Sequence, residues 1–126
     1  MNVVDSCGWL EFFADGPNAS FFTGAIENVK ELIVPTLSIY EVFKRILQQR
    51  SEGDALQAIA LMEQGHIIEL DARLAVLAAH ISIDNQLTIA DSIMLSTSIA
   101  YNATFWTQDS HFDKMKNIKH IKAKKQ

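Results

Sequence analysis

Four acidic residues are the side chains of this sequence most able to do chemistry together, because each lies at the end of a predicted strand or near the start of a predicted helix. They are Asp5, Glu41, Asp91 and Asp109. Carboxylates that converge repel one another, and protons or a bound cation must relieve that repulsion. Ligation by oxygen atoms suits Mg²⁺ or Mn²⁺, and one or two such ions could activate a water for in-line attack on phosphorus. The four acids therefore predict a metal site with hydrolytic chemistry on phosphate esters.

Three of these acids also have a structural interpretation. Residues 38–41 and 88–91 have the S/T-x-x-D/E spacing of a capping box, in which the acid binds a free backbone N–H at the start of a helix. Asp109 could be a cap or turn residue in the same way. Asp5 is different, because an acid directly after a buried first strand has no obvious packing duty. Both interpretations stay open for the other three acids.

Hydrophobic periodicity predicts the elements that position the acids. Short apolar runs predict strands, whereas apolar residues repeated every three or four positions predict helices. The expected strands are residues 1–4, 32–34, 67–70, 104–107 and 119–121. The expected helices are residues 9–13, 21–26, 38–47, 54–64, 74–81 and 88–101, with Gly65 as the stop of the fourth.

The order of these elements predicts the fold class. Strands alternate with helices or helix pairs along the whole chain, which is typical of an α/β three-layer sandwich around a mostly parallel sheet of four or five strands. Ligands of such sheets bind at the edge formed by the carboxyl ends of the strands. We therefore expect the acids at that edge.

The composition predicts one globular domain. The chain has 126 residues, of which 48% are apolar and 21% charged, so it can bury a core of its own. Its single cysteine, Cys7, cannot form an intrachain disulfide and is expected to pack under the first helix. No apolar stretch is long enough to cross a bilayer, and the first residues do not resemble a signal peptide. We therefore expect a cytoplasmic protein with a single domain over residues 1–121 and no membrane contact.

Charge is unevenly distributed along the chain. The formal net charge is −4, but residues 114–126 contain six lysines and no acid, so the rest of the chain is strongly acidic. An acidic body repels the phosphates of nucleic acids unless a bound cation reverses the local sign. Residues 122–126 are expected to form a basic, solvated tail that could also attract RNA phosphates. The residues better placed to bind RNA near the site are Lys44, Arg45 and Arg50.

Short motifs around the four acids resemble those of PIN domains. The motifs are Val3-Val4-Asp5-Ser6, Tyr40-Glu41-Val42, Ile89-Ala90-Asp91-Ser92 and Thr107-Gln108-Asp109. Their order, spacing and flanking residues look most like the small toxin ribonucleases of VapC type, and the resemblance spans residues 1 to about 121. It implies a PIN-like fold and a Mg²⁺- or Mn²⁺-dependent endoribonuclease whose metal is held by the acidic quartet. It further implies products with a 3′-hydroxyl and a 5′-phosphate.

The resemblance also implies partners and supporting residues. Such proteins are commonly toxins of type II toxin–antitoxin pairs, held inactive by a small antitoxin that inserts a segment near the site, and they often form homodimers. Ser6 and Thr107 match positions where a hydroxyl supports the acids by hydrogen bonding. Family members often carry a second acid two residues after the fourth, where this sequence has His111, with Asp113 two residues further on. The number of metal ions and the participation of His111 or Asp113 stay open, and His111 could be a proton donor or an exposed turn residue.

Two other classes of function remain compatible with the sequence. A PIN-like binding module without catalytic activity would share the fold, and the retention of all four acids is the one feature against it. A phosphoacceptor receiver domain has a similar length and also gathers acids at strand ends. Receiver domains usually show an adjacent acid pair after the first strand and a lysine on the last strand near a proline, and neither feature is visible in the sequence. The choice of RNA over DNA comes from the resemblance alone.

Overall fold

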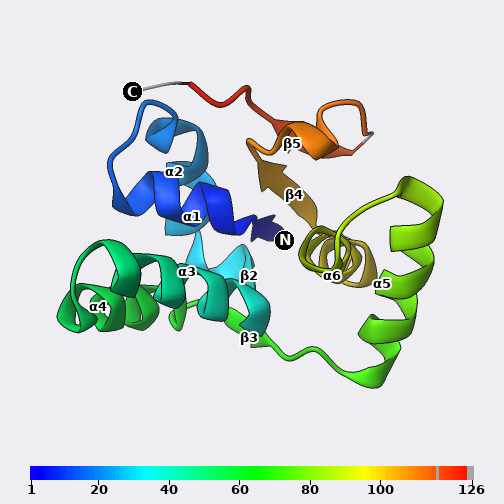
Figure 1. Ribbon diagram of the computed structural model, residues 1–126, viewed down its shortest axis with the longest axis horizontal. Helices are drawn as coiled ribbons and strands as arrows, with labels where there is room; N and C mark the ends of the chain where they lie inside the picture. The colour runs from blue at the N-terminus through cyan, green and yellow to red at the C-terminus, as the bar shows by residue number, and fades with distance from the viewer. Residues whose placement is uncertain (116, 125–126) are drawn as a thin grey trace.

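The structure, a computed structural model, describes residues 1–115 and 117–124. Its centre is a sheet of five strands in the order β3-β2-β1-β4-β5, and every pairing is parallel (Figure 1). The strands are β1 (Asn2–Val4), β2 (Leu32–Pro35), β3 (His66–Ile68), β4 (Thr104–Thr107) and β5 (Ile118–His120). The predicted α/β fold is confirmed, and within the described residues the sheet is wholly parallel.

Among the described residues, six α-helices and two short 3₁₀-helices connect these strands. They are α1 (Ser6–Phe13), α2 (Ala19–Glu27), η1 (Val29–Glu31), α3 (Thr36–Gln49), α4 (Glu52–Met62), α5 (Ala72–Asn85), α6 (Ile89–Ala100) and η2 (Ser110–Phe112). Helices α1 to α4 cover one face of the sheet and α5 and α6 cover the other, which gives the expected three layers (Figure 1). None of these helices is both long enough and apolar enough to span a membrane.

Two hydrophobic cores lie on opposite faces of the sheet, because successive residues of a strand point to opposite sides. Val4 packs with Trp9 on the face covered by α1 to α4, while its neighbour Val3 packs with Met94 and Phe105 on the other face. Each of these five side chains is at most 1% exposed. Strand β1 is therefore buried on both faces, and the residue that follows it leaves the sheet from a well-packed position.

The carboxyl ends of β1 and β4 meet where the chain reverses its direction across the sheet. From β1 the chain moves outward to β2 and β3, and α5 and α6 then carry it back to β4 on the other side of β1. Loops diverge at such a point and leave a crevice at the carboxyl edge. Asp5 follows β1, and its N–H still bonds the Trp106 carbonyl oxygen at 2.9 Å, while Asp109 follows β4. Because α6 directly precedes β4, its first turn lies at the same edge.

The third strand differs from its predicted extent of residues 67–70. It is β3, an edge strand that begins one residue earlier and whose first two residues are exposed. Its pairing ends with Ile68 opposite Pro35, where β2 gives way to α3. The last two predicted residues have no strand to pair with, so the prediction was wrong there.

Gly65 does not cap the helix before it, as the sequence had suggested. Helix α4 already ends at Met62. A Cβ atom at position 65 would lie 3.0 Å from the Leu32 carbonyl oxygen and 3.0 Å from Val34 Cγ2. The glycine therefore allows the chain to pass close to β2 as it enters the sheet.

The chain after β5 stays in contact with the domain at least to Lys122. The Ile121 N–H donates to the Thr107 carbonyl oxygen at 3.1 Å, and Asn18 Nδ2 donates to the Lys122 carbonyl oxygen at 3.0 Å. Lys122 and Lys124 are exposed. The division into a domain over 1–121 and a basic tail over 122–126 stays a prediction, because Lys125 and Gln126, like Lys116, lie outside the described residues.

Candidate metal centre

Asp5 is a buried carboxylate at the end of β1, and it is only 5% exposed. Asp5 also has a structural role that the sequence analysis did not predict. It is the N-cap of α1, and its Oδ1 accepts a hydrogen bond from the Ser6 N–H at 2.9 Å. Desolvation by burial raises the pKa of Asp5 to about 6. The bonds from Thr107 and Ser6 oppose this rise in pKa, and the charge of Asp91 adds to it. A proton or a cation beside Asp5 would therefore stabilise the folded protein.

Thr107 joins Asp5 to Asp109. It is fully buried at the end of β4, its Oγ1 donates to Asp5 Oδ2 at 2.8 Å, and the same Oγ1 accepts from the Asp109 N–H at 2.9 Å. Asp109 is the N-cap of η2 and accepts the His111 N–H on Oδ1 at 2.9 Å. The capping interpretation of Asp109 is therefore correct. As a cap, Asp109 still places its carboxylate at the carboxyl edge of the sheet.

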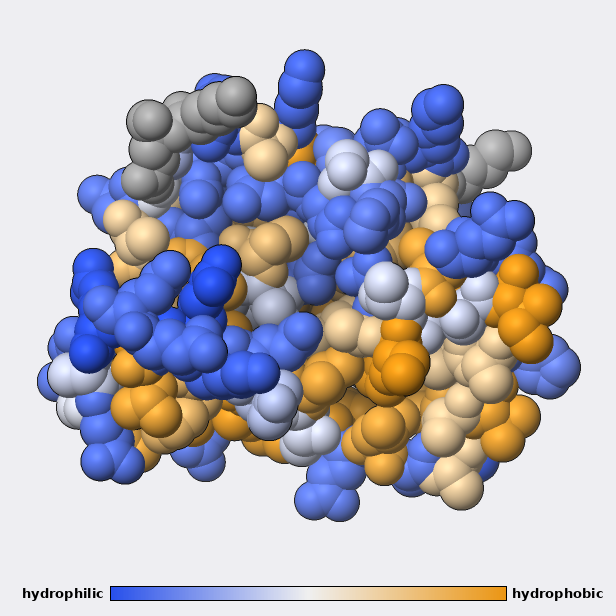
Figure 2. Space-filling model, viewed as in Figure 1, coloured by the Kyte–Doolittle hydropathy of each residue, from blue (hydrophilic) through white to orange (hydrophobic). Residues whose placement is uncertain are grey.

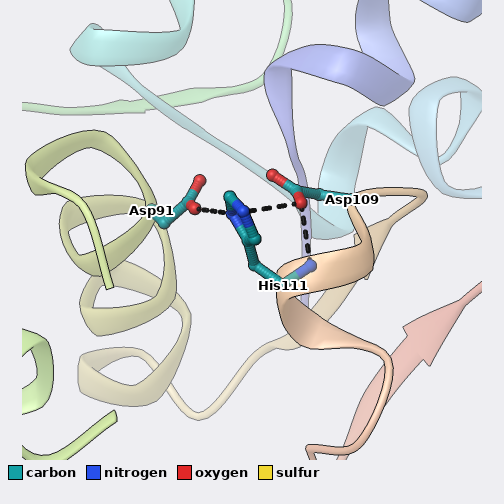
Figure 3. A group of neighbouring side chains, drawn as sticks. All are labelled: Asp91, Asp109 and His111. Atoms are coloured by element: carbon teal, nitrogen blue, oxygen red, sulfur yellow. Dashed lines mark hydrogen bonds and ion pairs between the residues drawn. The ribbon is translucent and has the colours of Figure 1, made fainter. Parts of the chain in front are cut away.

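Asp91 lies in the first turn of α6, and Thr88 is the N-cap of that helix. Thr88 Oγ1 accepts the Asp91 N–H at 3.3 Å, so the predicted capping box is half formed. The Asp91 carboxylate has a different partner, because its Oδ2 lies 2.8 Å from His111 Nδ1 (Figure 3). The side chain of Asp91 is 13% exposed, and its position at a helix N-terminus stabilises its negative charge.

Glu41 is not a capping residue, and that interpretation was wrong. Helix α3 begins at Thr36, directly after Pro35, which leaves Ser38 inside the helix with its Oγ donating to Met94 Sδ at 3.3 Å. Glu41 is then in the second turn, where its Oε1 accepts a hydrogen bond of 2.7 Å from Ser6 Oγ. Ser6 thus binds Glu41 with its side chain and Asp5 with its backbone.

His111 lies between two of the acids, and the sequence left its role open. Its Nδ1 is 2.8 Å from Asp91 Oδ2 and 3.3 Å from Asp109 Oδ1, although 59% of its side chain is exposed (Figure 3). The hydrogen bond with Asp91, and then the charges of Asp109 and Asp91, raise the pKa of His111. The signal for this contact in the sequence was the position of His111 two residues after Asp109.

The described residues contain one group of three or more side chains with metal-ligating atoms close together, and it consists of Asp91, Asp109 and His111. One ligand atom from each lies within 4.8 Å of the other two. Two carboxylates and an imidazole form a donor set that fits a divalent cation. Asp5 and Glu41 are connected to this group through Thr107 and Ser6, and Asp113 is exposed at the end of η2, outside it.

A cleft of about 740 Å³ lies between α1, α3 and α4, and neither the four acids nor His111 are among its lining residues. Cys7 and Gln108, the neighbours of the site, form one end of its lining, and Arg45 and Arg50 line its wall. Lys44 lies elsewhere, with its Nζ 5.6 Å from the centre of the Tyr40 ring. Two of the three predicted basic residues therefore line this groove, together with the acids Glu11 and Asp54.

Cys7 borders the site, and the expectation that it simply packs under the first helix was wrong. Its Sγ lies 3.5 Å from Asp5 Oδ2 and 3.5 Å from Thr107 Oγ1. Burial, and then the charge of Asp5, raise the pKa of the thiol to about 12. The sulfur therefore stays protonated at neutral pH and is not a nucleophile.

Comparisons with known proteins identify the family and the fold. A family model described as "PIN domain" matches residues 3–118. A toxin–antitoxin complex from Klebsiella pneumoniae is 15% identical, with a TM-score of 0.79 over 94% of this chain and 95% of the other. VapBC2 from Rickettsia felis, solved with a DNA fragment from its promoter, is 12% identical, with a TM-score of 0.73 over 96% and 97%.

A third similar structure is Mycobacterium tuberculosis VapC20, described as a toxin that cleaves the sarcin-ricin loop. It is 10% identical to this chain, with a TM-score of 0.69 over 83% of this chain and 87% of the other. No curated protein sequence is similar enough to count as a match. At these identities the structural likeness shows a shared fold.

Proposed function

Because this chain belongs to the PIN domain family, we propose that it is a metal-dependent endoribonuclease that hydrolyses RNA phosphodiesters with water. The observation that carries the proposal is the contact group of Asp91, Asp109 and His111, formed by two segments far apart in the sequence. Asp5 adds a buried carboxylate with a raised pKa at the same edge. Side chains with this chemistry, gathered where strands end, are suited to hold Mg²⁺ or Mn²⁺.

In this proposal Asp5, Asp91 and Asp109 hold the ion, and Glu41 either holds it or orients the attacking water. When bound, the ion would supply an acidified water and neutralise charge on the phosphate. Ser6 keeps one oxygen of Glu41 occupied, which leaves the other free to accept a proton from water. Thr107 fixes Asp5 through a bond of 2.8 Å. The expected products carry a 3′-hydroxyl and a 5′-phosphate.

The RNA strand is proposed to approach along the cleft between α1, α3 and α4. Arg45 and Arg50 line this cleft and would bind phosphates, whereas Lys44, which lies over the Tyr40 ring, would bind RNA only outside the cleft. The cleft also has apolar lining residues, including Leu10 and Phe13, against which bases could pack. Positive charge is needed on this path because the protein as a whole is acidic.

We further propose that the protein is the toxin of a type II toxin–antitoxin pair, acts in the cytoplasm and forms a homodimer. Support for the antitoxin comes from similar structures that are toxin–antitoxin complexes. Support for the homodimer comes from large apolar side chains exposed on α5 and at the start of α6, and Figure 2 shows such residues on the α5 side of the molecule. They are Val76, Ile83 and Ile89. Surfaces of this kind commonly mark protein contacts.

Asp91→Asn tests the nuclease proposal. The amide keeps the size of the side chain and its ability to accept a hydrogen bond, but it loses the charge. We expect cleavage of single-stranded RNA in Mg²⁺ or Mn²⁺ to fall by more than about a hundredfold. Circular dichroism and the thermal unfolding midpoint should stay close to those of the wild type.

Asp84→Asn is the matched control, since Asp84 is an exposed acid on α5. It should cleave like the wild type. Equal cleavage by the wild type and Asp91→Asn would overturn the proposal, and a wild type without any cleavage would favour a PIN-like binding module.

A further inference from the structure

His111 brings a nitrogen atom to a group that otherwise offers oxygen. Its position is well supported: the next residue, Phe112, is fully buried and packs edge-on against Phe105 with ring centres 5.1 Å apart. Asp109 holds the His111 backbone N–H at 2.9 Å. The turn η2 is therefore anchored on both sides of the histidine, and the ring points from it toward the acids of α6 and η2 (Figure 3).

The distances around Nδ1 suit a shared ion as well as a shared proton. Neighbouring ligand atoms around an octahedral ion with bonds of about 2.1 Å lie about 3 Å apart. Nδ1 is 2.8 Å from Asp91 Oδ2 and 3.3 Å from Asp109 Oδ1, which brackets that spacing. The lone pair of a neutral imidazole would then face the same space as the two carboxylate oxygens, and imidazole nitrogen is the commonest metal ligand in proteins.

On the proposed function, in which Asp91 and Asp109 hold the ion, we infer that His111 is a third ligand through Nδ1 and makes the site prefer Mn²⁺ to Mg²⁺. Mg²⁺ is bound mainly by oxygen and gives up its waters reluctantly. First-row transition ions accept imidazole nitrogen, with affinities that rise from Mn²⁺ toward Co²⁺ and beyond. One nitrogen donor in the set therefore strengthens Mn²⁺ binding more than Mg²⁺ binding.

The rival interpretation is that the imidazole only hydrogen-bonds the two acids. Its ring is 59% exposed and has room to turn outward when an ion enters. In that case His111 competes with the ion for Asp91 and Asp109. Removing the ring would then strengthen metal binding, whereas removing a ligand weakens it.

Pulsed electron paramagnetic resonance of the Mn²⁺-loaded protein tests the ligand directly, because a bonded imidazole nitrogen couples to the electron spin of Mn²⁺. We expect nitrogen coupling in the wild type and its loss in His111→Ala. By calorimetry, His111→Ala should bind Mn²⁺ about tenfold more weakly, with a much smaller change for Mg²⁺. His111→Asp, which replaces the nitrogen with oxygen, should keep Mg²⁺ binding and lose the preference for Mn²⁺.

His66→Ala is the matched control, since His66 is exposed at the amino end of β3, on the opposite edge of the sheet from the acids. It should retain both the coupling and the affinity. A wild-type spectrum without nitrogen coupling, an unchanged ratio of affinities in His111→Ala, or tighter Mn²⁺ binding by that variant overturns the inference. These readouts need no RNA, so nitrogen ligation without RNA cleavage would instead overturn the proposed nuclease.

Discussion

Ser6 Oγ donates a hydrogen bond of 2.7 Å to Glu41 Oε1, although the two residues are 35 positions apart in the sequence. The backbone N–H of Ser6 also donates to Asp5 Oδ1 at 2.9 Å. Ser6 is the first residue of α1 and only 7% exposed, so its position is set by the packing of that helix. One small residue therefore orients two of the proposed site acids.

Ser6→Ala should separate the orientation of Glu41 from its charge. The substitution leaves Glu41 in place without its donor, and we expect cleavage and Mn²⁺ affinity to fall by about tenfold. The free energy of unfolding should fall by about 1 kcal/mol for the lost bond. Glu41→Gln should lower Mn²⁺ affinity in calorimetry, because the amide can still accept the Ser6 bond but has lost its charge. Ser6→Ala should then have little further effect in the Glu41→Gln background, because orienting an uncharged side chain no longer helps the ion.

Ser98→Ala is the control for the Ser6 substitution. Ser98 is a buried serine near the end of α6, and its Oγ donates to the Leu95 carbonyl oxygen at 2.8 Å. This variant should lose stability without losing cleavage. Additive effects of Ser6→Ala and Glu41→Gln would show that the bond at the site has no functional role.

Asp5 should make the metal-free protein less stable as the pH rises. Its pKa is raised to about 6 in the folded state, so between about pH 4 and pH 6 the folded protein holds a proton that the unfolded chain releases. The free energy of unfolding should fall across this range by up to about 3 kcal/mol and stay low above it. Urea unfolding in the presence of a chelator, at about pH 4 and about pH 7.5, measures this loss.

Asp5→Asn isolates the contribution of Asp5 from that of the other acids. The variant should be more stable than the metal-free wild type at neutral pH and about equally stable near pH 4. Added Mn²⁺ at a hundred times its dissociation constant should stabilise the wild type by about 2.7 kcal/mol and Asp5→Asn much less. A wild type and variant with parallel pH profiles would contradict the raised pKa.

Arg45 and Arg50 should contribute to RNA affinity through their charge. Replacing either with Ala should weaken binding of single-stranded RNA and lower the dependence of log affinity on log salt by about 0.7 for each lost phosphate contact. Fluorescence anisotropy in a chelator measures binding without cleavage. Arg73→Ala, at the start of α5 beside a different cavity, should bind RNA like the wild type. The same loss in all three variants would contradict binding along the cleft.

Gly8→Ala should destabilise α1 and with it the site. A Cβ atom at this position would lie 2.7 Å from Phe22 Cδ1 and 2.7 Å from Val4 Cγ1, and both neighbours are fully buried. We expect a loss of about 1–3 kcal/mol in chemical unfolding. In Gly24→Ala, the added carbon would lie more than 4 Å from every heavy atom of the described residues outside its chain neighbours and its own helix backbone, so this variant should be up to about 1 kcal/mol more stable. Similar effects at both positions would contradict the packing argument.

The fold was predictable where local residue order determines it. A short apolar run such as Leu32–Val34 suits a strand covered on both faces, and alternating strands and helices leave few topologies. Thr88 caps α6, as its spacing from Asp91 predicted. The same spacing misled at Ser38, because Pro35 ends the preceding strand and α3 starts three residues earlier than the capping pattern required. A local pattern does not show where the neighbouring element ends.

By itself, the sequence determined which residue types stand at the ends of strands and the starts of helices, since that depends only on order along the chain. The acids of the candidate site were found in this way, whereas the supporting hydroxyls came from the resemblance to PIN domains. Only the tertiary structure decided which of them touch. His111 meets Asp91 from 20 positions away, and Ser6 meets Glu41 from 35, because packing of the helices on both faces of the sheet brings their ends together. Contacts of hydrogen-bond length depend on that packing to within a few tenths of an ångström, which spacing along the chain does not specify.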